Sequence, residues 1–197
     1  QPLVIDLPGH GKTQGFSSNN IQFYSEFLID ALEEFHLKNL VLCGHSMGGL
    51  IALDMLIGHG FSAKSLLLLN SIYPIKVSNA LIEKAKAGNG HAADFIIKFG
   101  LYKKLIGMKN IFPQEEALVM LNDLEACNNF ELNPRDLKNL ELPIALVLGA
   151  KDKLVDLKEV DNFAKHSSCV IHSINEVGHF PFFENPSELS NVITSIT

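Results

Sequence analysis

The feature that most constrains this chain is a serine set between glycines. Residues 44–48 read Gly-His-Ser-Met-Gly and fit G-x-S-x-G, a pattern in which a strand turns sharply into a helix and exposes the serine hydroxyl. The apolar residues 40–43 before it predict a buried strand, and the apolar run at 50–57 predicts the helix. The motif therefore predicts a strand–turn–helix unit with Ser46 at its apex.

This turn has steric and electrostatic requirements. Side chains at Gly44 and Gly48 would clash across it, so we expect glycine to be needed at both positions. The first N–H groups of the following helix have no partner within the helix, and the positive end of its dipole points at the serine. The N–H of Met47 is therefore the predicted oxyanion donor. A glycine-rich turn with a capping serine is the alternative interpretation.

Composition narrows the class of protein. The chain has 197 residues, 47% of them hydrophobic, which is enough for one domain with a sizeable core. Its net charge of −6 argues against a nucleic-acid-binding protein. No apolar stretch is long enough to span a membrane, and no signal peptide is visible.

Metal and cofactor signals are missing from the sequence. The three cysteines, Cys43, Cys127 and Cys169, follow no metal-like spacing, and we expect Cys43 and Cys169 to be small core residues in strands. An odd number of cysteines without an obvious pairing favours a cytoplasmic location. The turn at residues 6–13 contains two glycines but lacks the spacing of a phosphate-binding loop. We therefore expect no cofactor and no metal.

Strand and helix patterns alternate along most of the chain, which predicts an α/β fold with a mostly parallel sheet between two helical layers. Asn20 is the expected N-cap of the first helix, and Asn185 that of the last. The expected strands lie at residues 3–5, 40–43, 65–70, 143–150 and 169–174, and the expected helices at 21–37, 50–57, 157–166 and 186–196.

The middle of the chain has a different character. Residues 74–134 contain no strand signal and predict three helices, beginning near Ser78, His91 and Pro113. We interpret this region as a helical cap inserted between two strands. The cap divides the α/β core into residues 1–73, which hold the serine turn, and residues 135–197.

Partners for Ser46 are expected at the carboxyl ends of later strands, where parallel sheets carry their functional sites. Asp152 follows the strand at residues 143–150, and His179 follows the last strand on a loop that contains glycine. We predict that His179 accepts the proton of Ser46 and that Asp152 orients the imidazole. Asp156, deeper in the next helix, is the alternative acid. The other seven histidines are expected to pack or to lie on the surface.

At this point the chain resembles the α/β-hydrolase superfamily, in its small-cap serine esterase and enol-lactonase-like branch, including pimeloyl-[acyl carrier protein] methyl ester esterases. The resemblance rests on Asp-Leu-Pro-Gly-His-Gly at 6–11, the serine motif, Gly-Ala-Lys-Asp at 149–152, and Gly178-His179 with Glu-Asn-Pro at 184–186. In that family, further strands and a His-Gly loop with a second oxyanion donor precede the first of these motifs. The resemblance therefore implies that the N-terminal strands of the fold are absent from this chain.

The resemblance implies a serine hydrolase that cleaves a carboxylic ester through an acyl-enzyme. The family's dehalogenases and epoxide hydrolases use a carboxylate nucleophile, so Ser46 argues against them, and Met47 in place of tryptophan argues against proline iminopeptidases. Thioesterase, lactonase and C–C bond hydrolase activities remain open, as does a catalytically impaired fragment or binding module without the second oxyanion donor.

The expected cap is basic although the chain is acidic. Residues 74–112 contain seven lysines against two acids, a surplus of +5, so the remainder of the chain carries −11. Such a cap would steer an anionic or acyl-carrier-bound substrate toward the site. We expect Lys98, Lys103 and Lys104 to contribute, whereas a solvated helix face is the alternative explanation.

Overall fold

Four parallel strands form the central sheet, in the order β1-β2-β3-β4. The computed structural model describes residues 2–105 and 117–196. In the register of the sheet His45 lies beside Leu69, so the strands end at one common edge. The strands are β1 (Val41–His45), β2 (Ser65–Leu69), β3 (Ile144–Gly149) and β4 (Val170–Ile174).

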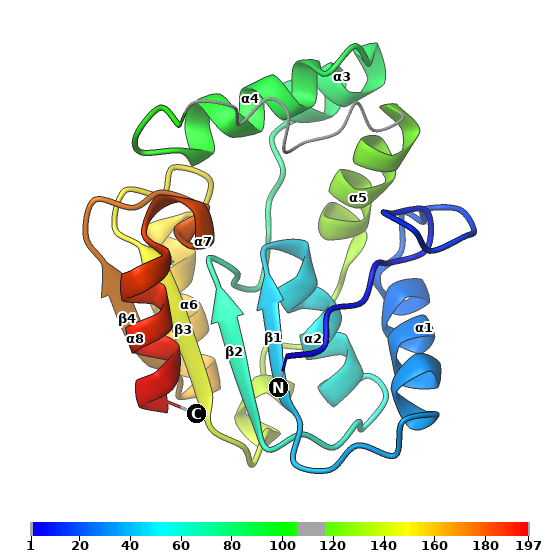
Figure 1. Cartoon of the computed structure of the whole chain (residues 1–197), viewed down its shortest axis with the longest axis vertical. Coiled ribbons are helices and arrows are strands. Elements are labelled where there is room, and N and C mark those ends of the chain that lie inside the picture. Colours follow the sequence, from blue (N-terminus) through cyan, green and yellow to red (C-terminus); the bar gives the residue numbers. More distant parts are fainter. Residues whose placement is uncertain (1, 106–116, 197) are drawn as a thin grey trace.

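Helices cover both faces of this sheet. Helices α2 and α6 pack on one face, α8 packs on the other, and α1 lies outside α2 (Figure 1). The predicted α/β fold with helices on both faces is therefore confirmed. The helices of these layers are α1 (Ile21–Glu33), α2 (Met47–Ile57), α6 (Leu157–Ser167), the short α7 (Pro181–Glu184) and α8 (Pro186–Ile196).

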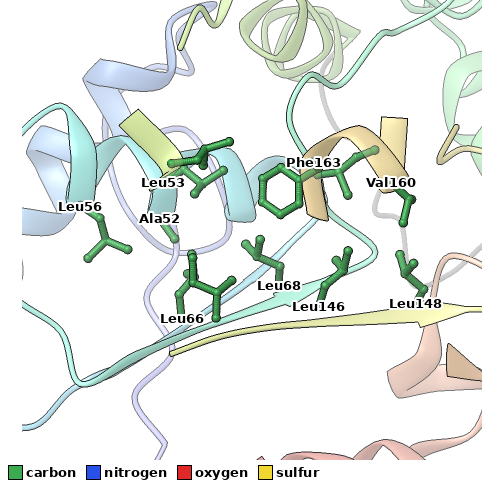
Figure 2. Close-up of a cluster of buried hydrophobic side chains, with 12 residues drawn as sticks. Ala52, Leu53, Leu56, Leu66, Leu68, Leu146, Leu148, Val160 and Phe163 are labelled. Atoms are coloured by element: carbon green, nitrogen blue, oxygen red, sulfur yellow. The ribbon is translucent and has the colours of Figure 1, made fainter. Parts of the chain in front are cut away.

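The largest core cluster lies between the sheet and helices α2 and α6. Figure 2 shows Leu66 and Leu68 of β2 facing Leu53 of α2 and Phe163 of α6. Their neighbours Leu67 and Leu69 point to the opposite face, where they pack with α8. This alternation follows from the two-residue period of a strand. It explains why residues 66–69 of β2 are all leucine, since both faces of the strand are buried there.

Three further helices lie beyond the carboxyl ends of the strands (Figure 1). They are α3 (Asn79–Ala87), α4 (His91–Gly100) and α5 (Ala117–Asn129), and a short 3₁₀ helix, η2 (Asp136–Asn139), leads back to the sheet. Ser78 caps α3 by accepting a hydrogen bond from the N–H of Leu81. The expected helix start at Pro113 lies outside the described residues.

Two expectations about the start of the sheet are wrong. Residues 3–5 form no strand, and Val4 is 86% exposed, because no described strand lies alongside to pair with their backbone. Cys43 is exposed rather than buried, because α8 covers the face of β2, β3 and β4 on that side and leaves β1 open. Cys169 is half-buried just before β4 and packs against the main core.

The expected ends of the helices also shift. The first helix stops at Glu33 rather than at Leu37, and Phe35 beyond it is 58% exposed. Asn20 caps this helix as predicted, accepting a hydrogen bond from the N–H of Gln22. No helix within residues 2–105 and 117–196 combines the length and apolar character needed to cross a membrane.

Candidate active site

Ser46 stands at the junction of β1 and α2 in strained backbone. Its φ of 50° lies in the left-handed region, which costs a non-glycine residue about 1–3 kcal/mol. Three hydrogen bonds hold it there. The Ser46 N–H donates to the Leu69 carbonyl (3.1 Å), and the Ser46 carbonyl accepts from the Gly49 N–H (3.0 Å) and from Ser71 Oγ (2.6 Å). The turn is therefore fixed from the neighbouring strand as well as from its own helix.

The glycine requirement of this turn differs from the expectation at one position. A Cβ on Gly44 would lie 2.3 Å from the Gly48 carbonyl oxygen, so glycine is required there. A Cβ on Gly48 would meet no atom within 4 Å, so the predicted clash at Gly48 is wrong. The second close approach is at Gly49, where a Cβ would lie 2.2 Å from Ser71 Oγ. Ser71 lies two residues beyond the end of the neighbouring strand β2, and the local motif does not reveal it.

His179 and Asp152 are joined by a hydrogen bond. His179 Nδ1 lies 2.7 Å from Asp152 Oδ2, and the two side chains are only 7% and 4% exposed. The other carboxylate oxygen of Asp152 accepts from the N–H groups of Leu154 (2.7 Å) and Val155 (3.3 Å). Because the carboxylate only accepts, Nδ1 carries the proton and Nε2 is left free to act as a base.

The surroundings of Asp152 keep it ionised. Burial by itself would raise the pKa of this carboxyl, but the hydrogen bond and charge of His179 act in the opposite direction, with smaller contributions from the Leu154 N–H and the Asn70 amide. The net result is a pKa below the ordinary value. Asp156, the alternative acid, instead caps α6, where it accepts from the Lys158 N–H at 2.9 Å.

Asn70 is a site residue that the sequence reasoning missed. It follows β2 directly and is 1% exposed, and its Nδ2 donates to Asp152 Oδ2 (2.6 Å) and to the Gly178 carbonyl (3.3 Å). It therefore connects the carboxylate with the loop that carries His179. The available signal was its position, since a polar residue at the carboxyl end of an apolar strand faces the same edge as Ser46.

His45 also has more than a packing role. Its Nε2 donates to the His179 carbonyl at 2.7 Å, and its ring packs against those of His179, Phe180 and Phe182. Desolvation by burial, with a smaller effect of the nearby His179, lowers the pKa of His45 to about 3. His45 is therefore a neutral support for the His179 loop.

The remaining predicted site residues are placed as follows. Met47 is the first residue of α2, so its N–H precedes the first hydrogen bond of that helix. Lys103 does not point freely toward the site, because its Nζ pairs with Glu176 Oε2 at 3.1 Å. Lys98 lies over the ring of Phe99 at 5.3 Å from its centroid. Among the described residues, no group of three or more His, Cys, Asp or Glu side chains could hold a metal ion.

A sequence model described as "Alpha/beta hydrolase family" matches residues 1–192. The chain belongs to this family. This membership agrees with the resemblance inferred from the motifs, and it supports a general role as a hydrolase.

Known proteins similar to this alpha/beta hydrolase include esterases and a lactonase. It is 22% identical to 3-oxoadipate enol-lactonase 1 of Acinetobacter baylyi, over 98% of this chain and 76% of the relative. It is 23% identical to the pimeloyl-[acyl-carrier protein] methyl ester esterase of Aromatoleum aromaticum, over 96% of this chain and 84% of the relative. The solved structure of a thermophilic esterase superposes with a TM-score of 0.85 at 23% identity, covering 96% of this chain and 77% of that one, which shows the shared fold.

The two glycines of the serine turn should respond oppositely to alanine. Gly48→Ala should leave the fold intact and raise the free energy of unfolding by up to about 1 kcal/mol, because alanine is the better helix former. Gly44→Ala should lower it by about 1–3 kcal/mol or more, because its Cβ meets backbone. Urea unfolding followed by circular dichroism measures both, and equal losses at the two positions would contradict the geometry.

His45 should make stability depend on pH. Its pKa is lower in the folded state than the ordinary value of 6.5, so as pH falls the unfolded chain binds the proton first. The contribution of neutral His45 to the free energy of unfolding is complete above the ordinary pKa of 6.5. It is lost as pH falls toward the pKa of His45 in the folded state. His45→Gln should therefore reduce the loss of unfolding free energy between pH 7.5 and pH 5 by about 1–2 kcal/mol. The exposed His91→Gln serves as the control, and an identical pH dependence in all three proteins would refute the assignment.

Proposed function

We propose that this chain is a serine hydrolase that cleaves a carboxylic ester through a covalent acyl-enzyme. The observation that carries the proposal is the buried hydrogen bond between His179 Nδ1 and Asp152 Oδ2, at the sheet edge where Ser46 occupies its strained turn. This bond leaves Nε2 of His179 as the base. A strained, half-buried serine with such a base can serve as a nucleophile.

In the first half of the proposed reaction, His179 Nε2 takes the proton of Ser46 as Oγ attacks the ester carbonyl. The negative charge that develops on the carbonyl oxygen is stabilised by the Met47 N–H and the N-terminal end of α2. Asp152 stabilises the imidazolium without taking its proton. When the tetrahedral intermediate collapses, the alkoxide leaves with the proton from His179, and the acyl group remains on Oγ.

In the second half, His179 removes a proton from water, and the resulting hydroxide attacks the acyl-enzyme. Collapse of the second tetrahedral intermediate releases the carboxylic acid, and the proton returns to Ser46 Oγ. The same residues could also act on a thioester, a lactone or a C–C bond, so these are the alternative substrates.

A fluorophosphonate probe tests the proposal directly, because it labels only a serine that a base activates. We expect stoichiometric labelling of the wild-type chain at Ser46 and none of Ser46→Ala. Asp152→Asn should lower kcat on p-nitrophenyl esters by about 10⁴, since an amide favours the wrong tautomer of His179.

The matched control is Asp156→Asn, which removes the same charge from a helix cap four residues away. It should leave kcat within about twofold, with only a small loss of stability. Turnover by Ser46→Ala at the wild-type rate would refute the nucleophile. A larger loss in Asp156→Asn than in Asp152→Asn would move the acid to Asp156. A matched ester, thioester and lactone panel then ranks the substrate classes.

We also infer that the substrate is an anionic ester or an acyl group bound to a carrier protein. The lysine surplus of the cap supports this inference, as does the similarity to the pimeloyl-[acyl-carrier protein] methyl ester esterase of Aromatoleum aromaticum. Because Lys103 pairs with Glu176, the steering charge rests on Lys98 and Lys104. Among the described residues, the structure gives neither of these two a carboxylate partner.

Removal of Lys98 and Lys104 by alanine should lower kcat/KM for a p-nitrophenyl ester that carries a carboxylate by about threefold to tenfold at low salt. A neutral ester of equal length should be nearly unaffected, and the difference should shrink at 0.15 M salt, where the screening length is about 8 Å. The control replaces Lys38 and Lys138, which are exposed near the opposite ends of the strands. Equal losses with both esters, or with both lysine pairs, would exclude steering by the cap.

A further inference from the structure

Two segments that are far apart in the sequence meet above the sheet edge. One is the C-terminal end of α4 with the residues after it, 100–103, and the other is the loop 176–184, which carries His179. Figure 1 shows the end of α4 close to α7, which forms the last part of this second segment. The helices beyond the sheet therefore touch the loop of the proposed base directly.

The contact is a close approach of backbones. The N–H of His179 donates to the carbonyl of Gly100 at 2.6 Å. A Cβ on Gly178 would lie 2.1 Å from that same carbonyl oxygen, and a Cβ on Gly100 would lie 2.8 Å from the Phe180 ring. Glycine on both sides lets the two segments meet at this distance. The position of His179 thus depends on the position of Gly100.

Glu184 holds these two segments together with one carboxylate. Its Oε1 accepts from the N–H of Gly178 at 2.8 Å, and its Oε2 accepts from the N–H of Tyr102 at 2.8 Å and of Lys103 at 3.4 Å. Hydrogen bonds to an ionised carboxylate are stronger than those between neutral groups. The proposed mechanism uses none of these contacts.

We propose that Glu184 is a positioning residue that couples the end of α4 to the orientation of His179. The coupling runs through the N–H groups of Gly178, Tyr102 and Lys103, which share its carboxylate, and through the bond from His179 to Gly100. If the end of α4 moves, His179 moves with it relative to Asp152 and Ser46. The catalytic part of this inference rests on the proposed function, whereas the structural coupling does not.

Glu184→Gln tests the link that the Glu184 carboxylate makes between Gly178 and Tyr102. Its amide has one oxygen that accepts and one NH₂ group that cannot, so either Gly178 or Tyr102 loses its acceptor. We expect the amide hydrogen-exchange rate of His179 to rise by on the order of tenfold, measured by NMR. We also expect the rate of fluorophosphonate labelling at Ser46 to fall by about tenfold, while the fraction labelled at long times stays at the wild-type value.

The end point of labelling distinguishes positioning from simple loss of fold. A structural defect lowers the fraction of chains that can be labelled, whereas a displaced base slows the labelling of every chain. The control Glu141→Gln removes a charge from an exposed loop residue before β3 and should change neither quantity. Gly100→Ala perturbs the same contact from the α4 side, and it should slow labelling in the same way without any change at Glu184.

Each result supports or overturns the inference. Unchanged exchange at His179 in Glu184→Gln would overturn it. So would faster exchange with a wild-type labelling rate, because Glu184 would then be only a structural tie. If wild-type Ser46 is not labelled at all, the proposed function fails, and the exchange rates of Glu184→Gln and Gly100→Ala still decide whether Glu184 holds His179 in place.

Discussion

The site depends on hydrogen bonds that continue the sheet one residue beyond each strand. Ser46 donates its N–H to the Leu69 carbonyl, Asn70 donates to Val147, and Ala150 donates to the end of β4. Since the strands are parallel and in register, these bonds bring the residues that follow each strand to one edge. The strained turn at Ser46 persists because the neighbouring strand holds it.

The same edge gathers a polar cluster in which several donors converge on the Asp152 carboxylate. Asp152 is almost completely buried, and a carboxylate in that position would be costly without donors. It receives hydrogen bonds from the His179 ring, the Asn70 amide and the N–H groups of Leu154 and Val155. These donors keep the Asp152 carboxylate ionised, and the carboxylate in turn restricts the His179 ring to one tautomer. The acid is therefore stabilised by several strands and loops at once.

The expectations that were wrong share one cause. The clash predicted at Gly48 is found at Gly49, because Ser71 approaches from the segment that follows β2. Residues 3–5 have the composition of a strand but no described strand beside them, and no helix of the described residues covers Cys43 on its face of β1. In each case the sequence pattern describes the local conformation of a segment. It does not show which other segment packs against it.

The sequence by itself determined the α/β fold and the candidates Ser46, Asp152 and His179. Period-2 and helical apolar patterns are local, and in a parallel sheet the residue that follows each strand must reach the same edge. Only the tertiary structure revealed the roles of Asn70 and Glu184, because these roles depend on hydrogen bonds to segments 82 or more residues away. Such contacts are set by how α4, β2 and the His179 loop pack together, and no spacing along the chain encodes that distance.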